Sequence, residues 1–296
     1  MQAPDLRGEP RRNIFNTGLR SVQDGVFWGL CGLALLCIVG PAVWIIVSLL
    51  STAAPALNLD LLTKTTQEGG LQNAILGTLV LAVGVLIVAG TLGIGAGIFL
   101  AEFAPARMAR GLRIFPEVLA GVPSIIIGYT GYLLLVIAFH WGFSVVSAVV
   151  ALSALVTPYI VKSTEVSLNQ VPSTLREAGV AMGLPTVVQM RRVLLPPALP
   201  GIITGLIIAV AISTGETAPL LYTADFSNQN PSLPLLHNPI AYLTYVTYYY
   251  IQLPAAKDHA LANAAGAVTL IILLILIVIG RIISWAAARQ TARMGL

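Results

Sequence analysis

The sequence predicts an all-α polytopic membrane protein with about six transmembrane helices. Hydrophobic residues make up 57% of the 296 positions and charged residues only 9%, whereas a soluble domain carries roughly 25% charged residues. The apolar residues are concentrated in long blocks, and a helix that crosses the hydrocarbon core needs about 20 consecutive apolar residues. Because a backbone in lipid must satisfy its own hydrogen bonds, we expect blocks of this length to be helices rather than barrel strands.

Each apolar block predicts one span. In chain order the predicted spans are residues 26–50, 72–101, 117–139, 143–161, 200–221 and 261–285. They follow an N-terminal tail of residues 1–25, and with their connections they form one transmembrane domain over residues 26–296. The first block is longer than the apolar core of about 7–15 residues in a secretory signal. We therefore expect it to remain as a span, although the small residues at 51–55 could mimic a cleavage site.

The basic residues predict which side of the membrane each loop occupies. All Lys and Arg residues except Lys64 and Lys257 fall in the N-terminal tail, the loop after the second block, the long loop 162–199 or the C-terminus. Cytoplasmic loops are enriched in Lys and Arg, so both termini are expected in the cytoplasm. The net charge of +4 therefore reflects membrane topology rather than binding to nucleic acid.

The long loop 162–199 predicts two short helices separated by a glycine turn. Thr174 and Glu177 have the spacing of a capping box, which opens a helix. Gly183 suits the left-handed turn that ends a helix, and Pro185 suits the first turn of the next one. We therefore expect a helix, a glycine turn and a second helix on the cytoplasmic face.

The same loop resembles the EAA loop of type I ABC importer permeases. That pattern reads Glu-Ala-Ala, three residues, Gly, nine residues, Ile, one residue and Leu-Pro. Its positions are occupied here, at the family's spacing, by Glu177, Ala178, Gly179, Gly183, Val193, Leu195 and Pro196. The resemblance implies the type I ABC importer permease fold, and it implies that these residues couple the chain to a separate ATPase. The alternative is a surface helix that only packs beneath the membrane.

The end of the fifth block carries the most informative charge in the chain. An ionisable residue at membrane depth costs about 2.5–3.5 kcal/mol on insertion scales, so Glu216 should face protein or a water-filled path. Ser213, Thr214 and Thr217 could line the same path with hydroxyl groups. Two interpretations remain open for Glu216, a residue of the path or gate and a structural carboxylate buried at a subunit interface.

The third block contains a second candidate gate. Pro123 and Ser124 lie inside this block beside Gly121, and a proline and glycine together commonly kink a helix. The kink could form a gate beside the path or a static bend that only serves packing.

Four stretches resemble PstA-type phosphate permeases, namely Thr91–Gly97, Gly121–Gly128, Ser232–Pro234 and Gly215–Leu221. The resemblance covers roughly residues 70 to 285 and implies phosphate import across the bacterial plasma (inner) membrane. It also implies a PstC-type second permease, a PstB-type ATPase dimer and a PstS-type extracytoplasmic phosphate-binding protein. One position departs from it, because Ile212 stands where relatives can carry an arginine.

Several other patterns exclude function classes. The chain has no glycine-rich loop ending in Gly-Lys-Ser/Thr, so ATP is expected to be used by partner subunits and no cofactor by this chain. Gly93, Gly95 and Gly97 lie in an apolar block and predict close helix packing rather than nucleotide binding. No metal-ligand spacing or catalytic constellation occurs, so we expect a non-catalytic subunit. The alternatives are an importer for another oxyanion (sulfate or molybdate) and an ATPase-independent channel or carrier.

Overall fold

The structure, a computed structural model, describes residues 15–293. The chain divides between Ser51 and Thr52 into two compact units. Residues 1–14 of the predicted tail lie outside the described part. Helix α1 (Phe15–Ala53), most of which belongs to the first unit, covers the first predicted span and begins within the predicted tail. No charged residue occurs from Val26 to Leu50, as expected for a helix surrounded by lipid.

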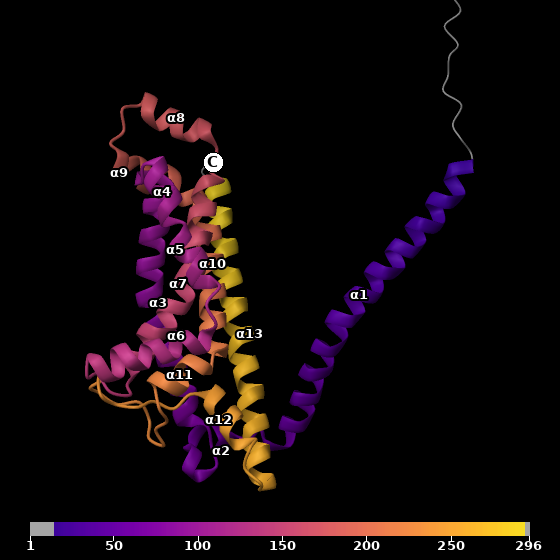
Figure 1. Cartoon of the computed structure of the whole chain (residues 1–296), viewed down its shortest axis with the longest axis vertical. Coiled ribbons are helices and arrows are strands. Elements are labelled where there is room, and N and C mark those ends of the chain that lie inside the picture. Colours follow the sequence, from indigo (N-terminus) through magenta and orange to yellow (C-terminus); the bar gives the residue numbers. More distant parts are fainter. Residues whose placement is uncertain (1–14, 294–296) are drawn as a thin grey trace, which may run out of the picture. The chain divides into compact units, whose positions relative to one another are not determined.

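The second unit is a bundle built around α7 (Val145–Asn169). Helices α3 (Gln72–Ile98) and α10 (Leu195–Gly215) both pack on α7, and α13 (Ala256–Arg293) packs on α10 (Figure 1). The described residues include five helices that are long and apolar enough to cross a membrane, α1 among them. A bent pair of helices supplies a sixth if it crosses as one, in agreement with the prediction of about six.

Glycines allow the three central helices to approach closely. A Cβ atom on Gly97 of α3 would lie 2.5 Å from Cβ of Thr164, and one on Gly205 of α10 would lie 2.4 Å from Cβ of Ser163. Both partners belong to α7. Each of these glycines has another glycine four residues earlier that also packs on α7, at Gly93 and Gly201. Such pairs of small residues bring membrane helices together. The packing role predicted for Gly93 and Gly97 is confirmed, whereas that predicted for Gly95 is wrong, because nothing lies within 4 Å of a Cβ atom there.

The third predicted span, 117–139, is not one straight helix. Helices α4 (Ala106–Leu112) and α5 (Ile114–Ala120) are followed by α6 (Ser124–Gly131), which continues as a π-helical segment over Tyr132–Ala138. The two halves meet at an angle of 97°. The break falls at residues 121–123 because Pro123 precedes α6 with extended backbone, φ −55° and ψ 136°. A proline cannot continue the hydrogen bonding of the preceding helix.

Other helices end at places that differ from the predicted spans. Helix α7 continues to Asn169, so Lys162 lies inside a helix rather than in a loop. Helix α10 ends at Gly215, and a separate short helix, α11 (Ala218–Thr223), follows it. Hydropathy detects where apolar residues stop, whereas helical hydrogen bonding can continue beyond that point or break before it. Further described elements are α2 (Leu59–Thr63), α12 (Leu243–Tyr250) and two short turns, Ala54–Ala56 and Thr66–Glu68.

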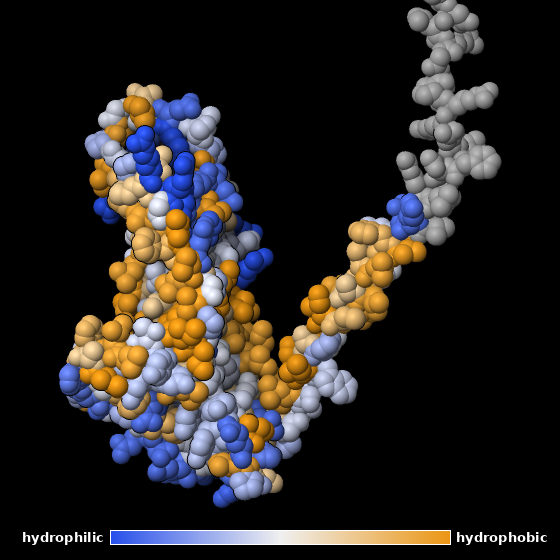
Figure 2. All heavy atoms as spheres, in the orientation of Figure 1, coloured by the Kyte–Doolittle hydropathy of each residue, from blue (hydrophilic) through white to orange (hydrophobic). Residues whose placement is uncertain are grey.

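The bundle has two polar ends. Figure 2 shows that, in the second unit, hydrophobic side chains gather around the middle of the bundle and hydrophilic ones at both ends. One end carries α4, α8 (Ser173–Ala181) and α9 (Thr186–Gln189), and we call it the α8 end. The opposite end carries α2 and α12, and we call it the α12 end. The apolar zone between them is the part suited to lipid.

Candidate functional site

The α8 end carries the helix–turn–helix that the sequence predicts. Helices α8 and α9 are separated by Gly183, whose φ of +67° is left-handed. The N–H of Leu184 donates to the carbonyl of Gly179 at 3.1 Å, and the N–H of Gly183 donates to that of Val180 at 2.9 Å. This pair of bonds is the Schellman arrangement that ends many helices at a glycine.

The start of α8 differs from the prediction. The N-cap position is Pro172, and no side chain caps the helix there. The predicted capping box between Thr174 and Glu177 is therefore wrong. The helix begins before Thr174, because Pro172 already provides the change from extended to helical backbone.

One face of this helical pair is anchored in the bundle. Leu175 and Val193 pack against a buried apolar cluster that draws its members from the end of α7, the segment after α9 and the start of α10: Leu168, Val171, Met190, Leu194, Ala198 and Ile202. A π-helical segment, Met190–Leu194, joins α9 to α10 without a loop. Helix α8 thus packs on the cluster at the end of α7, and α9 is continuous with α10.

The opposite face of the pair is open to solvent and partly apolar. Val180, Met182 and Val187 are 69%, 71% and 62% exposed, and Glu177 and Ala178 are exposed beside them. We call these five residues the outer face of α8 and α9. Apolar side chains gathered at a polar end of a protein are typical of a binding surface for another protein.

The predicted coupling residues therefore divide into four groups. Glu177 and Ala178 belong to the outer face, and Gly183 forms the turn. Val193, Leu195 and Pro196 are half-buried at the junction with α10. Gly179 is buried, because a Cβ atom there would lie 2.8 Å from Nε2 of Gln189. That amide donates to the carbonyl of Arg176 at 2.8 Å, so glycine at position 179 lets Gln189 tie α9 to α8.

Sequence reasoning missed Arg176, which it counted only as a basic residue on one side of the membrane. Its guanidinium forms an ion pair with Glu102 and donates a second hydrogen bond to the carbonyl of Leu168 at 2.7 Å. Glu102 lies in the π-helical segment Phe99–Phe103 that ends α3. The sequence does contain a signal for this pair. Glu102 is a single acidic residue in an apolar stretch, and a carboxylate in such surroundings needs a partner.

A second ion pair lies nearby and was also missed. Nε of Arg113 donates to a carboxylate oxygen of Glu165 at 2.5 Å, and the Glu165 side chain is only 6% exposed. Glu165 belongs to α7 and Arg113 separates α4 from α5, so the pair ties the bent helix pair to the centre of the bundle. A looser pair joins Lys162 and Glu117 at 3.8 Å with both side chains exposed.

The predicted path residues meet where α10 breaks. Glu216 follows the last residue of α10 and has extended backbone, with ψ of 139°. Its carbonyl accepts a hydrogen bond from the hydroxyl of Thr244 in α12 at 3.0 Å. Its carboxylate is half-buried, and no described residue forms a hydrogen bond or ion pair with it. Glu216 is thus the charged group at this break that is left for an outside partner.

The hydroxyl groups near Glu216 are less available than the sequence suggests. Ser213 and Thr214 are buried, and both donate to the carbonyl of Val210, at 2.9 and 2.8 Å. Thr217 is half-buried at the start of α11. In this conformation the hydroxyl of Thr217 is therefore more available at the break than the hydroxyls of Ser213 and Thr214.

The other candidate gate lies beside the same break. Pro123 is exposed and Ser124 half-buried at the 97° bend. Helix α6 packs on α11 so closely that a Cβ on Gly128 would lie 2.6 Å from Cα of Pro219. The bend after α5 and the break after α10 are thereby linked through one helix contact.

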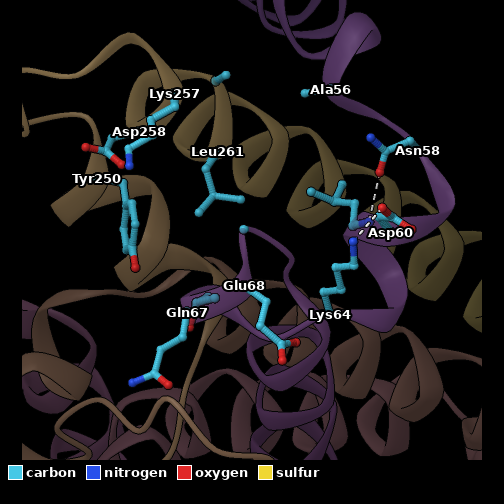
Figure 3. Close-up of a pocket in the computed structure, with 14 residues that line it drawn as sticks. Ala56, Asn58, Asp60, Lys64, Gln67, Glu68, Tyr250, Lys257, Asp258 and Leu261 are labelled. Atoms are coloured by element: carbon cyan, nitrogen blue, oxygen red, sulfur yellow. Dashed lines mark hydrogen bonds and ion pairs between the residues drawn. The ribbon is translucent and has the colours of Figure 1, made fainter.

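The α12 end contains a hollow of about 640 Å³ between α2, α12 and the start of α13 (Figure 3). Lys64 forms an ion pair with Asp60 at 2.7 Å, which raises the pKa of Lys64 above its ordinary value. Lys257 and Asp258 line the same hollow. Because charges of both signs line it, the hollow shows no preference for an anion.

The tyrosines of the α12 end differ in their contacts and burial. Tyr245 stacks between Phe226 and Tyr249, with ring centroids 4.5 and 5.4 Å apart. Tyr242 is 1% exposed, and burial raises the pKa of its phenol. Tyr242 thus belongs to the core, whereas Tyr248 and Tyr249 are exposed.

Comparisons with known proteins agree with this arrangement. Residues 93–295 match the family described as the binding-protein-dependent transport system inner membrane component. The phosphate transport system permease protein PstA 2 of Mycobacterium tuberculosis is 42% identical over 283 residues, which cover 95% of this chain and 93% of that protein. The phosphate transport system permease protein PstA of Haemophilus influenzae is 37% identical over 259 residues, 86% of each chain.

Solved structures show the same fold. An inward-facing conformation of the MetNI methionine ABC transporter contains a chain that superposes with a TM-score of 0.61. The match covers 78% of this chain and 99% of that chain at 19% identity. A second crystal form gives a TM-score of 0.56 at 20% identity, over 74% and 94% of the two chains.

Proposed function

The chain belongs to the family of binding-protein-dependent transport system inner membrane components, among the phosphate permeases named PstA, and we propose that it forms half of the phosphate path of an ATP-driven importer. Relatives with that name match nearly the whole chain, including α8 and the break at Glu216. The observation that carries the coupling role is the outer face of α8 and α9, anchored in the bundle on one side and open on the other.

The proposal requires three kinds of partner. A PstC-type permease supplies the other half of the path, and a PstB-type ATPase dimer binds and hydrolyses ATP. A PstS-type protein delivers phosphate on the opposite side of the membrane. This chain contributes no catalytic group and no cofactor, since its role is to bind one partner and to move.

The proposed orientation places both termini and the α8 end in the cytoplasm. Arg107, Arg110, Arg191 and Arg192 belong to α4 or to the segment after α9, and all four are exposed. Among the residues that the structure describes, the basic residues of the α12 end are Lys64 and Lys257. Because basic residues are retained on the cytoplasmic side, this asymmetry supports an ATPase bound at α8.

Coupling would proceed by rigid contact. When the ATPase subunits close, they press on the outer face of α8 and α9. The apolar cluster beneath α8 passes the displacement to α7 and α10. Helix α10 ends at Gly215, directly before Glu216, and the next helix, α11, contacts α6, so the same movement would reach both candidate gates.

Glu216 is proposed to act at the permease interface. Its carboxylate is left without a partner by the described residues, and an anionic substrate would be repelled by a lone carboxylate. A cation from the second permease would pair with Glu216 and neutralise the charge that repels the anion, whereas this chain has Ile212 where relatives can carry an arginine. Thr217 and backbone N–H groups at the break supply further hydrogen-bond donors.

The test of the coupling role uses the complete importer. Glu177→Arg and Val180→Asp each change the outer face, and both are expected to abolish phosphate uptake while the chain stays in the membrane. Leu59→Asp is the matched control, since Leu59 is 79% exposed in α2. It should leave the ATPase bound. Normal uptake in both outer-face variants would contradict the proposal.

The substrate and the energy source are tested separately. Labelled phosphate uptake should resist competition by sulfate and molybdate, and competition as strong as that of phosphate would favour another oxyanion. The reconstituted chain alone should carry no phosphate. Phosphate flux without the ATPase would favour a channel or carrier.

A further inference from the structure

We propose that Arg176 is a positioning residue that locks α8 to the end of α3 through Glu102, so that movement of the ATPase pulls the bundle as well as pushes it. This inference rests on the proposed function, because it concerns how α8 passes on the work of the ATPase. It adds α3 to the elements that α8 moves.

Arg176 connects α8 to three other elements at once. Its guanidinium pairs with Glu102 at the end of α3 and donates to the carbonyl of Leu168 in the last turn of α7 at 2.7 Å. Its own carbonyl accepts the amide of Gln189 from α9. Among the described residues of α8, Arg176 is the one with an ion pair to another helix. It also directly precedes Glu177 of the outer face.

The pair is shielded from water on its acidic side. The side chain of Glu102 is 13% exposed and that of Arg176 is 29% exposed. A carboxylate that is mostly buried is stable only with a partner, and removal of one member of such a pair leaves an uncompensated charge. The interaction therefore favours a single placement of α8 against α3.

Apolar contact and this ion pair resist different movements. The cluster beneath α8 resists compression, but hydrophobic contact has no direction and allows sliding or separation. A guanidinium with two oriented hydrogen bonds to charged and carbonyl oxygens resists both. Packing alone can thus transmit the closing of the ATPase subunits. When these subunits open again and draw α8 away from the bundle, a contact that resists separation is needed. The Arg176–Glu102 pair is suited to that task.

The test measures coupling in the whole importer, reconstituted with its second permease, ATPase and binding protein. Arg176→Met and Glu102→Gln each break the pair, and the second change keeps the shape of the side chain. Arg110→Met is the matched control, because Arg110 is an exposed arginine at the same end without an ion pair among the described residues. The quantity measured is the phosphate carried per ATP hydrolysed, together with the amount of ATPase bound to the permease.

Both single variants should lower the phosphate carried per ATP by about tenfold while the ATPase remains bound. The double variant should be no worse than either single, since the two residues act through one contact. Arg110→Met should match the wild type. A structural role alone would instead lower the amount of assembled importer and leave the ratio unchanged.

The inference is overturned if Glu102→Gln keeps the wild-type ratio, or if the losses of the two single variants multiply in the double. If Arg176→Met fails to accumulate in the membrane, Glu102→Gln decides alone. These outcomes differ from failure of the proposed function, in which the wild-type complex itself would carry no phosphate on ATP hydrolysis.

Discussion

At the scale of single residues, glycines control how α8 and the central helices are placed. Gly183 adopts a left-handed conformation, which costs a residue with a Cβ atom roughly 1–2 kcal/mol. Gly97 instead has ordinary helical backbone, but it packs directly on Thr164. The same residue type therefore serves a turn in one place and close packing in another, and different substitutions test the two roles.

Gly183→Val should abolish or strongly reduce phosphate uptake at normal membrane levels. A β-branched residue strains a positive φ, so the turn between α8 and α9 would open and the outer face would be displaced. Asparagine tolerates this conformation, so Gly183→Asn is expected to retain most of the uptake. Equal uptake by both variants would show that the turn geometry is unimportant.

Gly97→Ala should destabilise the bundle by about 1–3 kcal/mol through overpacking against α7. Gly95→Ala is the matched control, because nothing lies within 4 Å of a Cβ atom at that position of the same helix. It should leave stability unchanged or raise it by about 0.5–1 kcal/mol, since alanine favours helices. Thermal unfolding of the purified protein in detergent measures both, and equal melting temperatures would contradict the packing described.

At the scale of elements, ion pairs join helices that the chain order does not bring together. Arg176 with Glu102 ties α8 to α3, and Arg113 with Glu165 ties the bent pair to α7. Both acidic partners are largely buried, and both pairs lie toward the α8 end of the bundle. This end is therefore held by directional contacts, whereas the middle of the bundle is held by close apolar packing.

Arg113→Met should destabilise the protein by about 3 kcal/mol or more, because it leaves the carboxylate of Glu165 buried and unpaired. The double variant Arg113→Met with Glu165→Leu removes both charges and should regain most of the loss. Thermal unfolding in detergent again provides the measurement. A double variant that is less stable than Arg113→Met would contradict this, because it would mean that the pair stabilises the fold by more than neutralising the buried charge of Glu165.

At the scale of the whole molecule, the sequence predicts well both the class of fold and the helix–turn–helix formed by α8 and α9. Long apolar blocks identify α3, α7, α10 and α13, because composition alone determines which segments are stable in lipid. Gly183 predicts the turn between α8 and α9, because glycine suits the left-handed conformation that ends a helix. The sequence predicts only a kink where the structure has a 97° bend, because a hydropathy profile does not show in which direction a helix continues. Glu102 and Glu165 were missed because their partners are 74 and 52 residues away in the chain.

The central claim is that the ATPase binds the outer face of α8 and α9, and a site-specific photo-crosslinker at Met182 tests it most directly. Met182 is 71% exposed on that face, and Leu233, 82% exposed in the connection between α11 and α12, is the matched control position. In membranes that contain the complete importer, the account predicts a cross-link from position 182 to the ATPase and none from position 233. An ATPase that cross-links elsewhere on the chain but never at position 182 would contradict it.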